Sequence, residues 1–222
     1  MQPALKSKTL IDVSLGQALV KKGVITPSEL DTALELQKTR KNEYLGEILL
    51  SMGISQNKIN STLEYLNKRK KIGDILIDLG LITTEDLERA LQEQKRIQSK
   101  RGVRTPLGIL LHEMGLIYYR EYMRAISKHF VLPIVSLEGC TIPPSLQDVL
   151  GKKFVSKHHV LVLKNDEKKI KIALSAPTPS LMQEIRKSVP AHKDVVFCLA
   201  HPVEIEAAHK QMFDPFSVNC YR

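Results

Sequence analysis

The chain has 222 residues, of which 43% are hydrophobic and 26% are charged, a composition that suits a soluble globular protein of one or two domains. No apolar run approaches the ~20 residues needed to span a bilayer, and Lys6, Lys8 and Asp12 interrupt the N-terminus. We therefore expect no membrane insertion and no secretory signal. Three widely spaced cysteines indicate a reducing, cytoplasmic setting and argue against a disulfide framework or a zinc site.

The net charge is +9, and basic residues cluster at positions 38–41, 68–71 and 95–104. One interpretation is that these clusters are solvated helix ends, where cations complement the helix dipole. The other is that they attract phosphate groups on a nucleotide, a nucleic acid or a membrane. Charge alone leaves both interpretations open.

One phrase recurs four times within residues 1–137. Each copy begins with an apolar residue and a glycine, has a second glycine seven residues after the first, and ends at a closing position that is Gln in copies one and three. The first glycines are Gly16, Gly46, Gly73 and Gly108, the second glycines are Gly23, Gly53, Gly80 and Gly115, and the closing residues are Gln37, Leu66, Gln94 and His129. Such short units bury their apolar faces only by stacking on neighbours, so the region predicts a helical repeat.

Each copy predicts a short helix followed by a longer one. In copy one, Ser14 is expected to cap the short helix and Gly23 to end it in the left-handed conformation. Thr26 then caps the second helix, with Pro27 at the first helical position and Glu29 completing a capping box.

The later copies vary this pattern. Copy three has Gly80 as the stop and Thr83 as the cap of a helix over about 84–98, whereas copy two is shortened. Copy four is expected to have Thr105 as the cap, Pro106 at the first helical position and Gly115 as the stop.

The leucines at helical spacing are predicted to be core residues, namely Leu19, Leu30, Leu34, Leu76, Leu87 and Leu91. The second glycines are explained as helix stops. The first glycines fall inside a helical turn, where glycine costs roughly 1 kcal/mol relative to alanine. Their return in all four copies requires a close approach to the backbone, made by a neighbouring helix or by a ligand.

Residues 138–213 predict a small α+β domain. Two apolar runs separated by a polar turn indicate a β-hairpin, and a third strand and three helical segments surround it. The expected strands are 159–164, 169–174 and 195–199, and the expected helices are 145–150, 180–188 and 202–212. The predicted fold class is therefore α+β: an all-α tandem helical-repeat domain over 1–137, a small α+β domain over 138–213, and a tail over 214–222.

The tandem phrase L-G-x-x-Φ-Φ-x-x-G-Φ-Φ-x4-L-x3-L-x2-Q resembles the N-terminal domain of type II secretion and type IV pilus assembly ATPases, with its MshEN-type cyclic di-GMP-binding repeats. In that family two copies precede a short tail like residues 129–137. Copies three and four (67–137) therefore resemble the family's standard unit, and copies one and two (10–66) resemble a second unit placed ahead of it. Residues 138–213 resemble the segment that follows the motifs.

The resemblance implies a ligand site in which tandem copies embrace cyclic di-GMP. Apolar side chains would cover the purine faces, a glycine would admit the ligand to the backbone, and a cation would meet phosphate. The implied contacts are Leu15, Gly16, Leu30, Leu34, Gln37, Leu45, Gly46, Lys71, Ile72, Gly73, Leu87, Leu91, Gln94, Leu107 and Gly108.

The sequence departs from the family at the residue before each apolar-Gly pair, here called the leading position. The family has Arg there, whereas this chain has Ser14, Tyr44, Lys71 and Pro106, of which Lys71 alone carries charge. Lysine does not reproduce a bidentate guanidinium. Arg104, two residues before Pro106, offers a substitute cation.

No G-x-x-x-x-G-K-[ST] phosphate loop occurs in this sequence, so the ATPase engine of the relatives is missing from it, whether it is a free-standing protein or an excised piece. We expect no enzymatic activity, no required cofactor and no metal site. Nucleic-acid binding is disfavoured because the helix over 84–98 carries Glu85, Asp86, Glu88 and Glu93, which repel phosphates.

The leading hypothesis is a non-enzymatic, cytoplasmic regulatory or adaptor module, with cyclic di-GMP as a possible ligand. Its repeat region would bind either a cyclic dinucleotide or a partner, and its α+β domain would dock to secretion, pilus or signalling machinery. The alternative is a pure protein–protein adaptor with decayed nucleotide motifs.

Overall fold

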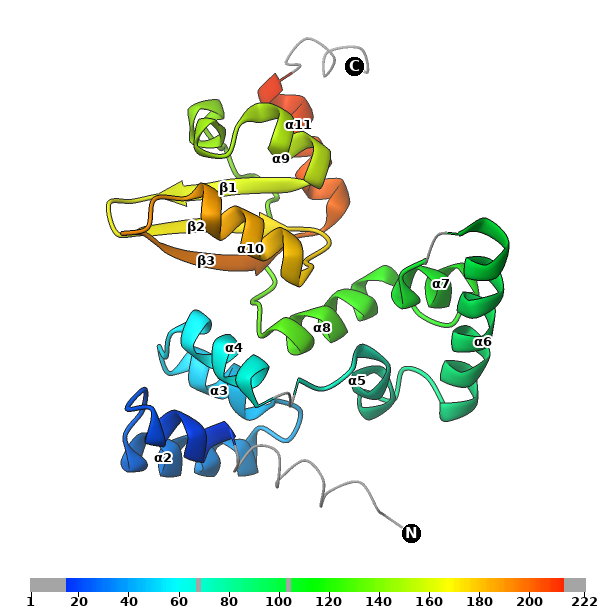
Figure 1. Ribbon diagram of the computed structural model, residues 1–222, viewed down its shortest axis with the longest axis horizontal. Coiled ribbons are helices and arrows are strands. Elements are labelled where there is room, and N and C mark those ends of the chain that lie inside the picture. Colours follow the sequence, from blue (N-terminus) through cyan, green and yellow to red (C-terminus); the bar gives the residue numbers. More distant parts are fainter. Residues whose placement is uncertain (1–14, 67–68, 103–104, 214–222) are drawn as a thin grey trace. The chain divides into compact units, whose positions relative to one another are not determined.

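The computed structural model describes residues 15–66, 69–102 and 105–213 (Figure 1), and the chain divides into two compact units, Met1–Val131 and Leu132–Arg222. The division falls earlier than the predicted boundary after residue 137. The reason is that residues 133–135 pair with the sheet of the second unit: the Val135 N–H donates to the Leu199 carbonyl and the Leu199 N–H donates to the Pro133 carbonyl, both at 2.8 Å. The predictions for Ser14, Arg104 and residues 214–222 lie outside the described residues.

The first unit is helical. Each copy supplies one short and one longer helix, as predicted, and residues 15–21 form the short helix of copy one. The labelled helices of its described part are α2 (Pro27–Thr39), α3 (Leu45–Ser51), α4 (Gln56–Tyr65), α5 (Ile72–Asp78), α6 (Thr84–Arg101), α7 (Leu107–Glu113) and α8 (Tyr119–Phe130).

The predicted helix boundaries are confirmed where local chemistry sets them. The Glu29 N–H donates to the Thr26 hydroxyl at 3.2 Å and the Thr26 N–H donates to the Glu29 carboxylate at 2.7 Å, which is the predicted capping box of α2. Thr83 caps α6 in the same way. The second glycine of each copy has a left-handed φ: +64° at Gly23, +89° at Gly53, +67° at Gly80 and +71° at Gly115.

The predicted start of copy four is wrong. Pro106 is the residue before α7 rather than its first helical residue, because its ψ of 136° is extended, and Thr105 makes no cap. In copy three, α6 runs on to Arg101, three residues beyond the predicted end near residue 98. Gly102, with φ of 68°, supplies the left-handed residue that ends α6, and its N–H donates to the Gln98 carbonyl.

The second unit contains a three-stranded sheet, so the predicted α+β class is confirmed. The predicted hairpin pairs antiparallel, and the third strand pairs parallel to the second after the crossover through α10. Helix α9 was not predicted, because only two apolar side chains interrupt its basic sequence. The elements in order are the 3₁₀ helix η1 (Pro144–Val149), α9 (Lys152–His158), β1 (Val160–Asn165), β2 (Lys169–Leu174), α10 (Pro179–Ser188), β3 (Asp194–Leu199) and α11 (Pro202–Phe213).

The two faces of this sheet are covered by different helices. Leu161, Ala173 and Cys198 are aligned across the strands and form one buried cluster with Ile205 of α11. On the other face α10 lies across the strands (Figure 1), and the Arg186 guanidinium sits 5.0 Å from the centre of the Phe197 ring. Burial on both faces explains why the strand sequences are nearly continuous apolar runs.

The outer edge of β1 is closed by one side chain. The Val162 N–H donates to the Gln147 side-chain carbonyl at 2.9 Å, and the Gln147 amide nitrogen donates to the Val162 carbonyl at 3.0 Å. Gln147, from η1, is fully buried. Its carboxamide therefore replaces a neighbouring strand at this edge.

We expect Gln147→Leu to destabilise the second unit by about 2 kcal/mol, because it leaves a buried N–H and a buried carbonyl without partners. Chemical denaturation followed by circular dichroism measures this. The same substitution at Gln183, an exposed residue of α10, is the control and is expected to change the free energy of unfolding by less than about 0.5 kcal/mol. Equal effects at both positions would contradict the assigned role of Gln147.

Candidate functional site

The first glycines of the repeats are in contact with the longer helix of their own copy. A Cβ added at Gly16 would lie 2.3 Å from a Leu30 methyl carbon, and one added at Gly73 would lie 2.8 Å from a Leu87 methyl carbon. Side-chain packing between helices thus accounts for the close approach that the sequence left open between a helix and a ligand.

Copy four shows the tightest version of this contact. A Cβ added at Gly108 would lie 2.0 Å from the Tyr122 ring, which stands at the position of the leucines in the other copies. The ring therefore lies flat against the glycine backbone. Gly46 of copy two is different, because its nearest neighbours are Val131 at 3.3 Å and Ile59 at 3.5 Å, which leaves nearly enough room for a methyl group.

The copies associate in pairs, and each pair has its own core. Copies one and two, the first pair, share a buried cluster that includes Leu19, Leu45 and Ile59. Copies three and four, the second pair, share a cluster that includes Leu76 and Leu111. In the second pair α6 packs on α7 and α5 packs on α8, so the longer helix of each copy contacts the short helix of the other.

The closing residues of the second pair bond the backbone of the opposite copy. The Gln94 amide nitrogen donates to the Thr105 carbonyl at 2.5 Å, and Nδ1 of His129 lies 2.7 Å from the Lys70 carbonyl. Thr105 and Lys70 occupy the same motif position, directly before the leading residue. The two bonds are thus equivalent, because the closing residue of each copy bonds the same backbone position of the other copy. This reciprocal arrangement, here called the two-fold exchange, relates copies three and four.

The first pair keeps half of this arrangement. The Gln37 amide nitrogen donates to the Glu43 carbonyl at 3.4 Å, and Glu43 again stands directly before the leading residue. Copy two closes with Leu66, which has no polar atom to return the bond. The sequence identified these closing positions but not the carbonyls that they hold, because the partners lie in another copy.

The protonation of His129 follows from its surroundings. Burial lowers the pKa of this imidazole, the hydrogen bond to the Lys70 carbonyl opposes that effect, and the nearby Arg69 charge adds to it. Since the carbonyl accepts, Nδ1 carries the proton and donates. His129 therefore acts as a neutral donor in the place of glutamine.

The leucines implied as ligand contacts differ in exposure. Leu15 and Leu45 are buried at 3% and 0%, whereas Leu91 is 38% exposed, so its prediction as a core residue is wrong. The remaining apolar candidates are half-buried: Leu30, Leu34, Ile72, Leu87 and Leu107. Among these apolar candidates, Leu91 has the largest exposed fraction.

Among the leading residues, Lys71 has the freest side chain. It is exposed and forms no hydrogen bond or ion pair with any residue of 15–66, 69–102 or 105–213. Arg69, two positions earlier, is not free. Its guanidinium donates to the Asn60 side-chain oxygen at 2.9 Å and to the His129 carbonyl at 2.6 Å, and it pairs with Glu64 at 3.2 Å. The sequence left the basic cluster over 68–71 open between a solvated helix end and a contact to phosphate, and Arg69 fits neither because its guanidinium is bound within the chain.

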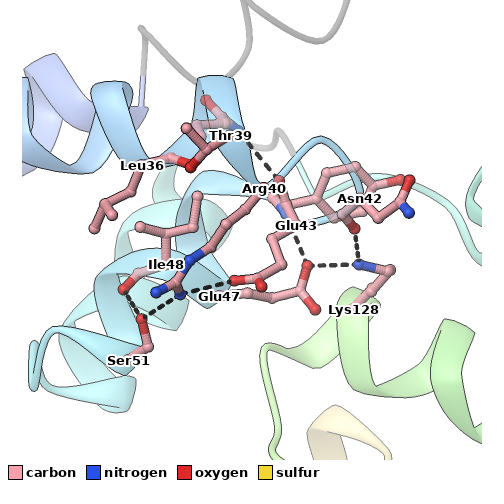
Figure 2. Close-up of polar contacts among 11 residues, drawn as sticks. Leu36, Thr39, Arg40, Asn42, Glu43, Glu47, Ile48, Ser51 and Lys128 are labelled. Atoms are coloured by element: carbon pink, nitrogen blue, oxygen red, sulfur yellow. Dashed lines mark hydrogen bonds and ion pairs between the residues drawn. The ribbon is translucent and has the colours of Figure 1, made fainter.

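The end of α8 is joined to the first pair by a second cation (Figure 2). The Lys128 ammonium donates to the Asn42 carbonyl at 2.6 Å and to the Glu47 carboxylate at 2.8 Å, and its side chain is 9% exposed. Nearby, Arg40 contacts Glu43 at 3.4 Å and so steadies the turn between α2 and α3. The sequence carries no signal for Lys128, because its partners lie more than eighty positions away.

Other reactive groups are placed for structure. Burial raises the pKa of the Cys198 thiol to about 11, with Lys171 opposing the shift, so this thiol is not a nucleophile at neutral pH. Within the described part of the chain, no group of three or more His, Cys, Asp or Glu side chains is arranged to hold a metal ion. No described helix has the length and apolar character to cross a membrane.

This chain is similar to one domain family and to three known proteins. Residues 130–217 match the MshEN domain family. The type IV pilus assembly ATPase PilB of Thermus thermophilus is 28% identical over 117 residues, which are 52% of this chain and 12% of that protein. A solved structure described as MshE with cdg superimposes with a TM-score of 0.57 at 20% identity, covering 65% of this chain and 100% of that one. The N-terminal domain of XpsE covers 64% of this chain and 93% of its own, at 18% identity and a TM-score of 0.49.

The chain therefore contains a match to the MshEN domain family over residues 130–217, and over 52% of its length it is similar to a pilus assembly ATPase. The MshEN match begins directly after the closing residue of the fourth repeat. The chain spans only 12% of the PilB relative, which is a much longer protein.

We expect Gly108→Ala to destabilise the first unit by about 1–3 kcal/mol, because the added methyl group meets the Tyr122 ring. Gly46→Ala is the matched control. It is expected to change the free energy of unfolding by less than about 1 kcal/mol, because the room at Gly46 lets the higher helix propensity of alanine compensate. Thermal unfolding followed by circular dichroism ranks the two variants, and a larger loss at Gly46 would contradict the packing described.

Acidification should weaken the first unit through His129. Its folded pKa lies below the ordinary 6.5, so the unfolded chain binds more protons near pH 6. The stabilisation is complete above pH 6.5 and is lost as pH falls through the folded pKa. We expect His129→Gln to unfold with a similar free energy at pH 7.5. Between pH 7.5 and pH 5 its free energy of unfolding should fall less than that of the unaltered chain. His192→Gln, at an exposed position, is the control. An unaltered pH profile in His129→Gln would refute this assignment.

Proposed function

We propose that this chain is a non-enzymatic, cytoplasmic regulatory or adaptor module of the pilus and secretion ATPase N-domain type, and that its second pair binds cyclic di-GMP. The observation that carries the proposal is the two-fold exchange between copies three and four. Cyclic di-GMP consists of two identical halves, and a two-fold pair of motifs presents equivalent surfaces to both halves. The Gln94–Thr105 and His129–Lys70 bonds hold the two leading segments in that equivalence.

Two features of the second pair suit an anionic purine ligand. Lys71 offers an exposed ammonium without a partner among the described residues, which favours a phosphate group. Leu91 at 38% and Ile109 at 41% exposure offer apolar surface to a base. The likeness in fold to MshE, whose solved structure contains cdg, supports the same ligand class.

The alternative is a protein–protein adaptor, which would dock to pilus, secretion or signalling machinery without a nucleotide. It is favoured by the same exposed side chains of Leu91 and Ile109, because apolar residues on helices commonly serve as anchors for a partner protein. It is also favoured by the loss of the family's arginine at every leading position.

Titration of the purified chain with cyclic di-GMP by isothermal calorimetry distinguishes the two functions, with GTP and ATP as controls. We expect saturable binding that Lys71→Ala weakens about tenfold, since a hydrogen bond to a charged group contributes about 1.5–3 kcal/mol. Lys71→Arg should retain the affinity. Lys58→Ala, an exposed lysine of α4, is the matched control and should bind like the unaltered chain. Absence of saturable binding would leave the adaptor function in its place.

A further inference from the structure

The leading position of copy two is engaged within the chain itself. The Tyr44 hydroxyl donates to the Asp78 carboxylate at 2.7 Å, and Lys70 pairs with the same carboxylate. The Tyr44 ring lies 4.9 Å from the Lys128 ammonium and 5.9 Å from the Lys70 ammonium. The residue that stands at the family's ligand-contacting arginine position thus joins the first pair to α5 of the second.

The remainder of this segment is covered as well. Gly46 faces the Val131 side chain, and Val131 belongs to the buried cluster of the first pair. The Glu47 carboxylate accepts hydrogen bonds from the Tyr44 N–H and from Lys128, both at 2.8 Å. The start of α3, with its leading residue and its glycine, is therefore packed against the end of α8.

Polar contacts reinforce this closure. The Gln56 amide nitrogen donates to the Val131 carbonyl at 3.2 Å, and Gln56 is 5% exposed. A ligand entering at Tyr44-Leu45-Gly46 would have to displace these contacts and would leave buried charges and carbonyls without partners. Such a loss costs about 1–3 kcal/mol for each neutral group and more for charged ones.

The leading residues of the second pair are open by comparison, whereas Gly73 and Gly108 are packed against Leu87 and Tyr122 of their own copies. Lys71 is exposed, Pro106 is exposed, and Leu91 and Ile109 present 38% and 41% of their surface. Gln94 and His129 hold its leading segments through the Thr105 and Lys70 carbonyls, and the Lys71 and Pro106 side chains stay exposed. The two pairs share one motif and differ in what lies over it.

We propose that the chain holds one cyclic-dinucleotide site, on the second pair, and that the corresponding face of the first pair is an internal docking surface closed by Tyr44, Glu47 and Lys128. This inference rests on the proposed function and adds its stoichiometry and its location. The first pair then serves as a support that fixes α5 and α8, the two helices that carry Lys71 and His129 at or beside their ends.

Calorimetric titration of the full chain with cyclic di-GMP tests the inference, and we expect one ligand per chain. A matched pair of variants locates the ligand: Gln94→Ala should weaken binding at least fivefold, and Gln37→Ala, at the same motif position of the first pair, should leave affinity and stoichiometry unchanged. Two ligands per chain, or a larger loss in Gln37→Ala, would overturn the single site while leaving the proposed function intact. No saturable binding would overturn both.

Hydrogen exchange gives a readout that does not depend on variants. Cyclic di-GMP is expected to protect amides of residues 71–80 and 106–115 and to leave those of residues 44–53 unchanged. Ligand-induced protection confined to 44–53 would place the site on the first pair and overturn the inference.

Discussion

The structure of the repeats depends on one hydrogen bond between copies. The backbone carbonyls directly before Tyr44, Lys71 and Pro106 lie in partly buried surroundings, where a carbonyl without a donor is costly. The closing side chain of the partner copy supplies that donor: Gln37 to Glu43, Gln94 to Thr105 and His129 to Lys70. A single copy cannot satisfy itself, so the motif folds in pairs.

A second constraint arises at the end of α8, where three neighbouring residues hold both pairs. Lys128 binds the turn before α3, His129 holds the carbonyl before Lys71, and the Val131 carbonyl accepts the Gln56 amide. Val131 has a φ of 52°, unusual for a β-branched residue, and these contacts on either side stabilise that conformation. The last turn of α8 therefore fixes the first pair and the second pair to one another within the first unit.

The sequence predicted the features that neighbouring residues determine. The capping boxes at Thr26 and Thr83, the left-handed glycine stops and the β-hairpin each depend on a few adjacent side chains, and all were confirmed. The contacts of Tyr44, Lys128 and Arg69 could not be predicted, because their partners come from other copies. The motif marked Gln94 as a candidate ligand contact without revealing that it holds the Thr105 carbonyl, since a backbone carbonyl has no sequence signature.

The copies differ in the chemistry of the side chain at the leading position. Tyr44 contributes a ring to two lysines and a hydroxyl to a carboxylate, both of which suit a contact inside the protein. Pro106 fixes an extended backbone before α7 and offers no donor. Lys71 keeps a solvated charge at the start of α5. In the proposed function, the unlike residues at three of the four leading positions provide one cation that meets the ligand, one structural bond and one backbone constraint. In this proposal the first pair binds no ligand of its own, because its corresponding surface is docked against the second pair.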